Sequence, residues 1–202
     1  MIVKLKEKYK NEVIKAMMEK FGYRNALAVP KIEKVVINTG FGKQASGKSS
    51  DEQKKIAASV AEDLALISGQ KPILTRSKKA ISGFKLRQGL VIGAKVTLRK
   101  RMMYDFLDRL IHIALPRSRD FRGIDNSSFD KKGNLTLAIK EQIAFPEVSP
   151  EKARGIFGLE VTVVTNAKTK EKGIALLRLL GFPIKEYNTN ATNSTRIQPI
   201  NS

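Results

Sequence analysis

One segment of the sequence, Gly42 to Ser49, has residue types and spacing that could bind a phosphate. It reads GKQASGKS and matches the phosphate-binding loop pattern G-x-x-x-x-G-K-[ST]. In such a loop the backbone N–H groups surround the phosphates, Lys48 would contact them and Ser49 would bind Mg²⁺. The segment also lies between an expected strand and an expected helix, as the motif requires. The chemistry that it suggests is nucleotide hydrolysis.

The rest of the sequence does not supply the other parts of a nucleotide hydrolase. We find no apolar run that ends in Asp and could provide the second magnesium contact. The strand before the loop, KIEKVVIN, begins with polar residues at alternate positions, whereas a central parallel strand is apolar throughout. The later elements also lack the alternation of strands and helices in that fold. A P-loop nucleotide hydrolase that uses Gly42–Ser49 is therefore the less favoured alternative.

Other catalytic and metal-binding arrangements have less support. His112 is the only histidine, and its spacing puts it on the polar side of an expected helix, one turn after Asp108. That position is typical of a surface histidine, and no nucleophile with a base and an orienting group is recognisable. Cysteine is absent, which excludes disulfides and thiolate sites. We therefore expect a protein that is not an enzyme and that has no metal site and no cofactor.

The charge of the sequence indicates binding to a polyanion. Lys and Arg number 38 and Asp and Glu 19, which gives a formal net charge of +19. Between Leu64 and Tyr104 there are ten Lys or Arg residues and no acid. Such a surface attracts nucleic acid or an anionic membrane. No apolar run approaches the roughly 18 residues of a spanning helix, and no secretory signal is present, so we expect a cytoplasmic protein without a membrane partner.

The aromatic content narrows the class of nucleic acid. Phe, Tyr and Trp together make up 6% of the residues, and Trp is absent. Proteins that bind single strands stack bases on aromatic side chains, so this composition does not favour them. Structured RNA that is recognised through its shape and backbone is the better match.

The periodicity of apolar residues predicts an α+β fold. A capping box of Ser50 and Gln53 marks the start of one helix, and Gly69 marks its end. The expected helices cover 4–21, 50–68, 101–115 and 169–180, and the expected strands cover 31–39, 72–75, 83–87, 90–101, 135–140 and 156–165. This order predicts a mostly antiparallel sheet with helices packed on one face, in a ferredoxin-like split arrangement. We expect residues 1–184 to form a single RNA-binding domain and 185–202 a polar, disordered tail.

Alternation within the acid-free segment predicts a cationic sheet surface. In the strand from Ile92 to Arg99, apolar residues alternate with Gly93, Lys95, Thr97 and Arg99. The same alternation, FKLR, puts Phe84 in the core and Lys85 and Arg87 outside. We expect Lys and Arg to bind phosphates on this surface and Thr97 to reach a 2′-OH or sugar.

Five segments of the sequence resemble a known family. They are VPKIEKVVINTGFG, LISGQKPILTRSKKAISGFKLRQG, IGAKVTLRKRMMYDFLDRLIHIALPRSRDFRG, NLTLAIKEQIAFPE and VVTNAKTKEKGIALLRLLGFP. Together they are similar to successive blocks of the bacterial-type large-subunit ribosomal protein five family. The resemblance implies a structural constituent of the large ribosomal subunit. The sequence alone leaves open whether that ribosome is bacterial or organellar, and the bacterial one is favoured. The resemblance also implies binding to 5S rRNA, which the family helps to attach to the central protuberance. Further implied partners are 23S rRNA, the P-site tRNA, a small-subunit head ribosomal protein and neighbouring 5S-binding ribosomal proteins.

The resemblance and the strand pattern together define three candidate sites. The expected rRNA-binding residues are Asn38, Thr39, Gly40, Gln70, Phe84, Lys85, Arg87, Lys95, Thr97 and Arg99. The expected tRNA-contact loop contains Arg76, Ser77, Lys78, Lys79 and Ser82. The expected subunit bridge contains Arg117, Arg119 and Arg122. The family would have Phe84 near the RNA, whereas the alternation puts it in the core, so its side of the sheet stays open.

The sequence departs from the family pattern in two places. The loop after Gly40 is usually more acidic in the family, and here it reads GKQASGKS, so we interpret the phosphate-loop match as accidental. The tail from Lys185 to Ser202 extends beyond the usual end of the family.

Overall fold

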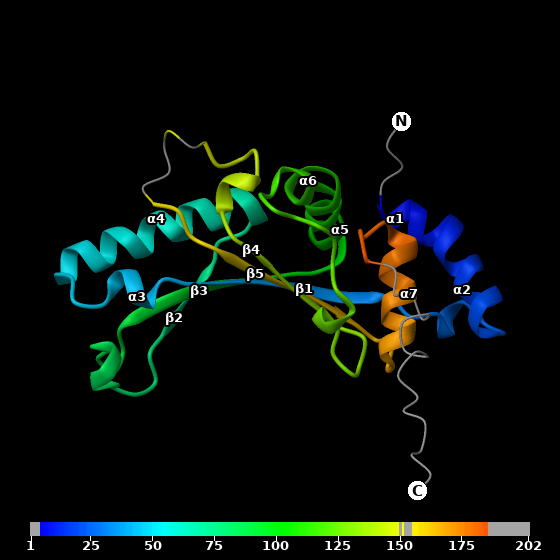
Figure 1. The fold of residues 1–202 in the computed structure, drawn as a ribbon, viewed down its shortest axis with the longest axis horizontal. Coiled ribbons are helices and arrows are strands. Elements are labelled where there is room, and N and C mark those ends of the chain that lie inside the picture. The colour runs from blue at the N-terminus through cyan, green and yellow to red at the C-terminus, as the bar shows by residue number, and fades with distance from the viewer. Residues whose placement is uncertain (1–4, 150, 152–154, 186–202) are drawn as a thin grey trace, which may run out of the picture.

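A five-stranded antiparallel sheet is the central layer of the computed structural model, which describes residues 5–149, 151 and 155–185 (Figure 1). The order of the strands is β2-β3-β1-β5-β4, and each neighbouring pair is antiparallel. The strands are β1 (Ile32–Gly40), β2 (Ile73–Arg76), β3 (Val91–Leu98), β4 (Leu135–Ile139) and β5 (Leu159–Thr165). Because β3 lies between β1 and β2, these strands form a split βαβ unit, and the predicted α+β class is confirmed.

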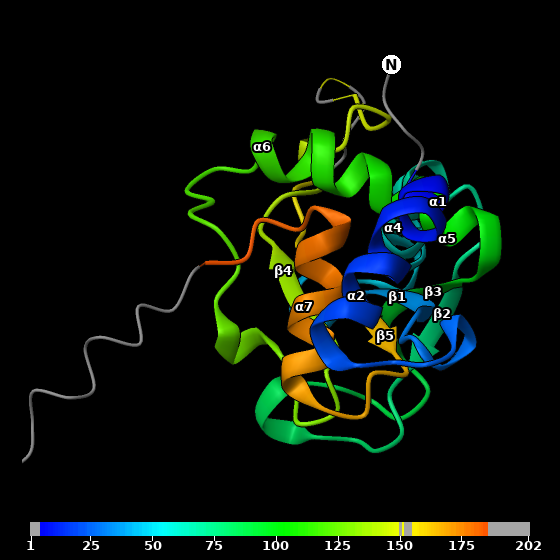
Figure 2. The same ribbon diagram turned by 90° about the vertical axis from the view of Figure 1, so that its right-hand side faces the viewer.

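Helices cover one face of this sheet and leave the other face open. Figures 1 and 2 show α4, α5 and α6 on the same side of the strands, with α1, α2 and α7 gathered at one end. The helices are α1 (Leu5–Lys8), α2 (Ile14–Phe21), α3 (Gly42–Ala45), α4 (Ser50–Ser68), α5 (Lys100–Arg109), α6 (Leu115–Arg117) and α7 (Lys170–Leu180). A π-helical turn at Tyr9–Val13 joins α1 to α2, and another at Leu110–Ala114 joins α5 to α6. An antiparallel sheet tolerates this one-sided cover because its alternate residues are polar.

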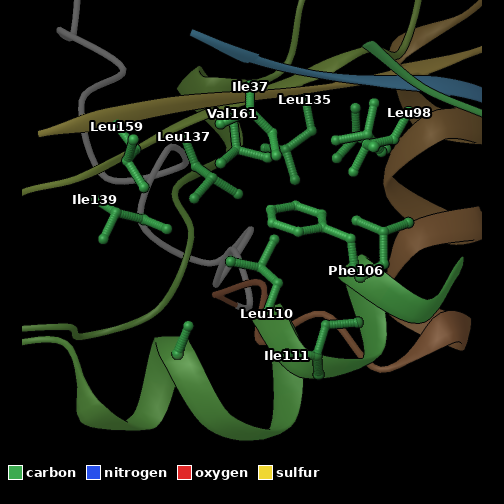
Figure 3. Packing of buried hydrophobic residues seen from close by; sticks show 14 of the residues in the cluster. Ile37, Leu98, Phe106, Leu110, Ile111, Leu135, Leu137, Ile139, Leu159 and Val161 are labelled. Carbon is green, nitrogen blue, oxygen red and sulfur yellow. The ribbon is translucent and has the colours of Figure 1, made fainter. Parts of the chain in front are cut away.

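The core lies between the covered face of the sheet and the helices. Figure 3 shows Phe106 and Leu110 pointing toward Ile37 and Val161 of the two central strands. All four side chains are buried, and the ring of Phe106 stacks on that of Phe145 at 5.8 Å between centroids. Apolar contact of this kind is the main stabilising term of a small α+β domain. It leaves the opposite face of the sheet free for a ligand.

The start of α4 differs by one residue from the prediction. Ser49 is the N-cap, its hydroxyl accepts from the Glu52 N–H, and the Glu52 carboxylate accepts from the Ser49 N–H. The capping box is therefore Ser49–Glu52 and not Ser50–Gln53. Gly69 ends the helix as predicted, with a left-handed φ of 68°.

The predicted strand over 83–87 is wrong. Ser82–Phe84 form a short 3₁₀ turn, and Lys85 has a left-handed φ of 50°. A strand requires an extended backbone at each residue, so these dihedral angles interrupt it. Residues 77–90 instead form one long connection between β2 and β3, which we call the β2–β3 loop. Of the predicted disordered tail, 185–202, only Lys185 is described, and its N–H donates to the Ile124 carbonyl at 3.0 Å. Residues 186–202 lie outside the described residues.

Candidate nucleic-acid interface

The residues on the open face of the sheet are set by the register of its central strands. Asn38 of β1 pairs with Lys95 of β3 on one side and with Glu160 of β5 on the other. Paired residues of an antiparallel sheet point to the same face. All three side chains are exposed, so they form a row across the middle of the open face.

A second row runs beside the first. Thr97 pairs with Val36, which in turn pairs with Thr162. Arg99 follows Thr97 by two residues and is exposed next to the start of α5. The alternation in β3 predicted that Lys95, Thr97 and Arg99 share a face, and the exposure of all three agrees with it. The face therefore combines two cations with hydroxyl and amide groups, which suits contacts to phosphate and sugar.

Glu160 adds a carboxylate to this surface that the sequence reasoning did not single out. The Asn38 side-chain amide donates to Glu160 Oε2 at 3.5 Å, a long hydrogen bond. The alternation of Glu160 and Thr162 with buried valines in β5 is the sequence signal that could have placed Glu160 here.

Thr39 does not share the open face, although it was grouped with Asn38 and Gly40. It is 3% exposed, and its hydroxyl donates to the Gly158 carbonyl at 2.8 Å. Its side chain is thus on the covered side and already has a partner. Gly40 is exposed, and a Cβ built on it would meet no atom within 4 Å. A ligand can approach the backbone at Gly40 without obstruction.

Gln70 lies at the margin of the open face. It is exposed in the turn between α4 and β2. A Cβ on its neighbour Gly69 would be 2.8 Å from Met102 Cε, so this turn is close to the first turn of α5. Gln70 is consequently at the same end of the sheet as Arg99.

The β2–β3 loop is held by backbone contacts near its base. The Ser77 N–H donates to the Leu90 carbonyl at 2.8 Å, and the Gly89 N–H donates to the Ser77 carbonyl at 2.9 Å. Ser77 is buried, and its hydroxyl donates to the Lys79 carbonyl at 2.6 Å. Ser77 therefore shapes the loop, whereas Lys78 and Lys79 are exposed on it.

Three residues predicted for the sheet surface belong to this loop instead. Phe84 is 70% exposed, so it is not in the core, where the strand alternation alone would have placed it. Lys85 and Arg87 are also exposed, and they lie with Ser82 beside Lys48 rather than beside Lys95. The reason is the turn at residues 82–85, which takes these side chains out of the sheet register.

The geometry of Gly42–Ser49 does not fit a nucleotide-hydrolysing loop. Its first four residues form α3, so they do not wrap around a phosphate. Ser49 is occupied as the N-cap of α4 and bonds Glu52. The preceding strand, β1, has antiparallel neighbours on both sides, whereas the motif belongs to parallel sheets.

The remaining candidates lie on helices and connections away from the open face. Arg117, Arg119 and Arg122 are exposed at the end of α6 and in the segment after it. His112 is exposed, and its Nδ1 lies 3.2 Å from Asp108 Oδ1, as expected of a surface histidine. Among the described residues there is no group of three or more His, Cys, Asp or Glu that could hold a metal ion. No helix in the described part of the chain is long and apolar enough to cross a membrane.

Comparison with known proteins gives consistent matches along the chain. The profile described as ribosomal protein L5 matches residues 25–87, and that of the ribosomal L5P family C-terminus matches residues 91–184. The large ribosomal subunit protein uL5 of Clostridium acetobutylicum is 52% identical over 186 residues, which cover 92% of this chain and all of that protein. The chain belongs to the ribosomal protein uL5 family. It is therefore similar to proteins that are components of the large ribosomal subunit and not enzymes.

Two further uL5 proteins show the same extent of similarity. That of Alkaliphilus oremlandii is 52% identical over 182 residues, covering 90% of this chain and 98% of that protein. That of Caldanaerobacter subterraneus subsp. tengcongensis is 51% identical over 180 residues, covering 89% and 97%. The family identified from the sequence is thus confirmed. The segment matched by the first profile contains β1 and β2, and the segment matched by the second contains β3, β4 and β5. Strands of the two segments alternate in the sheet, because β3 lies between β2 and β1.

Proposed function

We propose that this chain binds 5S rRNA on the open face of its sheet and helps to attach it to the central protuberance of the large subunit. The helix-free face with Asn38, Lys95, Thr97 and Arg99 carries this proposal. A helix-free surface with two cations and several hydrogen-bonding groups suits the backbone and 2′-OH groups of an RNA helix, which proteins recognise mainly by shape. The chain would act as one domain over residues 1–184, because the matched segments share one sheet.

The β2–β3 loop is proposed to contact the P-site tRNA. Lys78 and Lys79 are exposed on it, and Arg76 at its base donates to the Gly89 carbonyl at 3.3 Å. Exposed lysines on a projecting loop bind phosphates without reading sequence. The role of Arg76 and Ser77 would be to hold the loop in shape.

The segment after α6 is proposed to contact a protein of the small-subunit head. Arg117, Arg119 and Arg122 give it positive charge, and the carboxylate of Asp120 lies 3.6 Å from Lys140 Nζ. Exposed charges of both signs are typical of the polar rim of a protein interface. Contacts to 23S rRNA and to neighbouring 5S-binding ribosomal proteins complete the proposed set of partners.

The central test is the selectivity and the site of RNA binding. Purified protein should bind 5S rRNA more tightly than tRNA or duplex DNA, and its affinity should fall as salt rises. Arg99→Ala should weaken 5S binding, while Lys15→Ala, at an exposed position of α2 and outside the sheet, should not. Equal affinity for all three nucleic acids, or an Arg99→Ala variant with unchanged 5S affinity, would overturn the proposal.

A further inference from the structure

A cavity of about 640 Å³ lies between α3, the N-terminal half of α4 and residues 155–157. Its apolar lining comes from Ile56 and Val60 of α4 and from Phe157, which lies two residues before β5. Figure 1 shows α4 on the covered side of the sheet, so this cavity is separate from the face proposed for RNA.

One face of α4 forms the floor of the cavity. Glu52, Ile56 and Ser59 line it and follow one another at spacings of four and three residues, which puts them on the same side of a helix. Val60 continues this face and is buried, whereas Ile56 is half-buried. The part of Ile56 that stays exposed is apolar surface, and an apolar ligand in the cavity would remove it from water.

The wall opposite α4 is held in place by hydrogen bonds. The side chain of the buried Gln142 donates to the Gly155 carbonyl at 2.6 Å and accepts from the Phe157 N–H at 2.8 Å. The side-chain amide of Gln44, in α3, donates to the Ile156 carbonyl at 3.3 Å. These bonds fix residues 155–157 relative to α3, so the fold itself shapes the cavity.

The polar part of the cavity carries a surplus of positive charge. Lys43, Lys48 and Lys55 line it and are exposed, and within the described part of the chain none of them belongs to an ion pair. Glu52 is the one acid among the described lining residues. Its carboxylate accepts from the Ser49 N–H at 3.0 Å and from the Ser49 hydroxyl at 2.9 Å, and these bonds lower its pKa. Glu52 is thus engaged at the start of α4.

We propose that this cavity binds a small amphipathic carboxylate, with its apolar body against Ile56 and Phe157 and its acid group among the three lysines. Small-molecule sites have volumes of roughly 300–1,000 Å³ and combine apolar walls with a few polar groups that orient the ligand. A bare phosphate would gain nothing from the apolar floor. A magnesium nucleotide is disfavoured because Ser49, which would hold the metal, caps α4. The site does not depend on the proposed function, since it involves neither the open face nor the β2–β3 loop.

The ligand class is tested with the full chain and two fluorescent probes of the same apolar body. Pyrenebutyrate carries a carboxylate, and pyrenebutanol is its neutral analogue. The wild type should bind pyrenebutyrate at least about threefold more tightly than pyrenebutanol, because exposed charge pairs each contribute about 0.2–1 kcal/mol and a factor of ten corresponds to 1.4 kcal/mol. Equal affinity for the two probes, or no binding of pyrenebutyrate, would overturn the proposal.

A variant that fills the cavity tests its location. Ser59→Trp puts a large side chain on the floor of the cavity and should lower pyrenebutyrate affinity at least about tenfold. The matched control is Ala58→Trp, at the exposed neighbouring position of α4 and not among the lining residues, which should bind as the wild type does. Wild-type affinity in Ser59→Trp would exclude this cavity as the site.

A second variant tests the cationic rim and changes exposed side chains only. Lys43→Gln combined with Lys55→Gln should lower pyrenebutyrate affinity about threefold to tenfold and leave pyrenebutanol affinity unchanged. Lys10→Gln combined with Lys15→Gln removes the same charge from exposed positions of the N-terminal helices and should have no effect on either probe. An equal loss in both double variants would mean that the acid responds only to the net charge of the protein.

Competition experiments separate this site from those for nucleic acid and nucleotides. Pyrenebutyrate should stay bound when the protein is saturated with 5S rRNA, because α4 covers the opposite side of the sheet from the open face. Excess oligouridylate or Mg-ATP should not displace it either. Complete displacement by any of the three would overturn the proposal and assign the cavity to that ligand.

Discussion

Asn38 and Lys95 face each other across the β1–β3 ladder, and both side chains stand on the open face of the sheet. The pair puts a neutral amide beside a cation at the centre of the surface. The two groups should affect the salt dependence of RNA binding differently, because an ammonium that binds a phosphate releases counterions and a neutral amide does not. Their contributions can therefore be measured separately.

Lys95→Gln should lower 5S rRNA affinity and also reduce its dependence on salt. One lost phosphate contact lowers the slope of log affinity against log salt by about 0.7 to 0.9. Asn38→Ala should lower the affinity by roughly fivefold to tenfold with the slope unchanged, since a neutral hydrogen bond contributes about 1 kcal/mol. Titrations at several salt concentrations give both quantities. A slope that changes equally in the two variants would show that the amide does not act as a neutral contact.

Gly40 and Gly93 are opposite each other in the same ladder but have different surroundings. A Cβ on Gly93 would lie 2.7 Å from both the Thr39 carbonyl oxygen and Thr75 Oγ1, whereas a Cβ on Gly40 would meet nothing within 4 Å. Gly93→Ala should therefore reduce the free energy of unfolding by roughly 1–3 kcal/mol, as overpacking does. Gly40→Ala should leave stability within about 0.5 kcal/mol but weaken 5S binding several-fold.

Urea unfolding and RNA titration of both glycine variants check this difference. The added methyl group at Gly40 would separate the RNA backbone from β1, so the loss should appear in affinity alone. If Gly40→Ala binds 5S rRNA as the wild type does, the RNA does not approach the backbone there.

Lys78 and Lys79 should affect a different partner from that of the sheet. A double Lys78→Ala, Lys79→Ala variant should bind 5S rRNA with wild-type affinity, because both residues lie on the β2–β3 loop and not on the open face. On assembled ribosomes the same variant should hold P-site tRNA less tightly by several-fold. An equal loss of 5S affinity would instead locate the 5S site on the loop.

Much of the fold follows from periodicity that is visible in the sequence. The alternation in β3 correctly separated Ala94, Val96 and Leu98 from Lys95 and Thr97. The side chains of a strand alternate between the two faces of the sheet, and the face that carries the apolar side chains is the one that becomes buried. By the same rule Thr39 should have been assigned to the face opposite Asn38, so its position was predictable.

The β2–β3 loop shows where local pattern is insufficient. FKLR alternates like a strand, but Lys85 takes a left-handed conformation, and Ser46 bonds the Phe84 carbonyl from a segment far away in sequence. Neither feature has a local sequence signal. The position of Lys85 and Arg87 beside Lys48 was missed for the same reason, since these segments come together only through the tertiary fold. The predicted capping box was one residue too late, because Ser49 and Ser50 are each followed three residues later by a suitable partner, Glu52 and Gln53.

Asp63 provides a prediction about pH and stability. It lies on the buried side of α4 at 9% exposure, and its Oδ2 has no hydrogen-bond partner among the described residues. Burial raises the pKa of the Asp63 carboxyl, and the Gln142 side chain opposes this to a smaller extent. The folded state thus binds the proton more tightly than the unfolded state does. The contribution of this group to stability is present below its ordinary pKa and is lost as the pH rises through the raised value.

Asp63→Asn should consequently increase the free energy of unfolding at neutral pH, because it removes a charge that is poorly solvated in the folded state. This advantage over the wild type should shrink as the pH falls and should vanish below the ordinary Asp value of 3.8, where the wild-type carboxyl is also neutral. Urea unfolding at several pH values measures the difference. Glu19→Gln, at an exposed position of α2, is the control and should show no such trend. A difference between Asp63→Asn and wild type that is constant across the pH range would mean that the Asp63 carboxyl is well solvated in the folded protein.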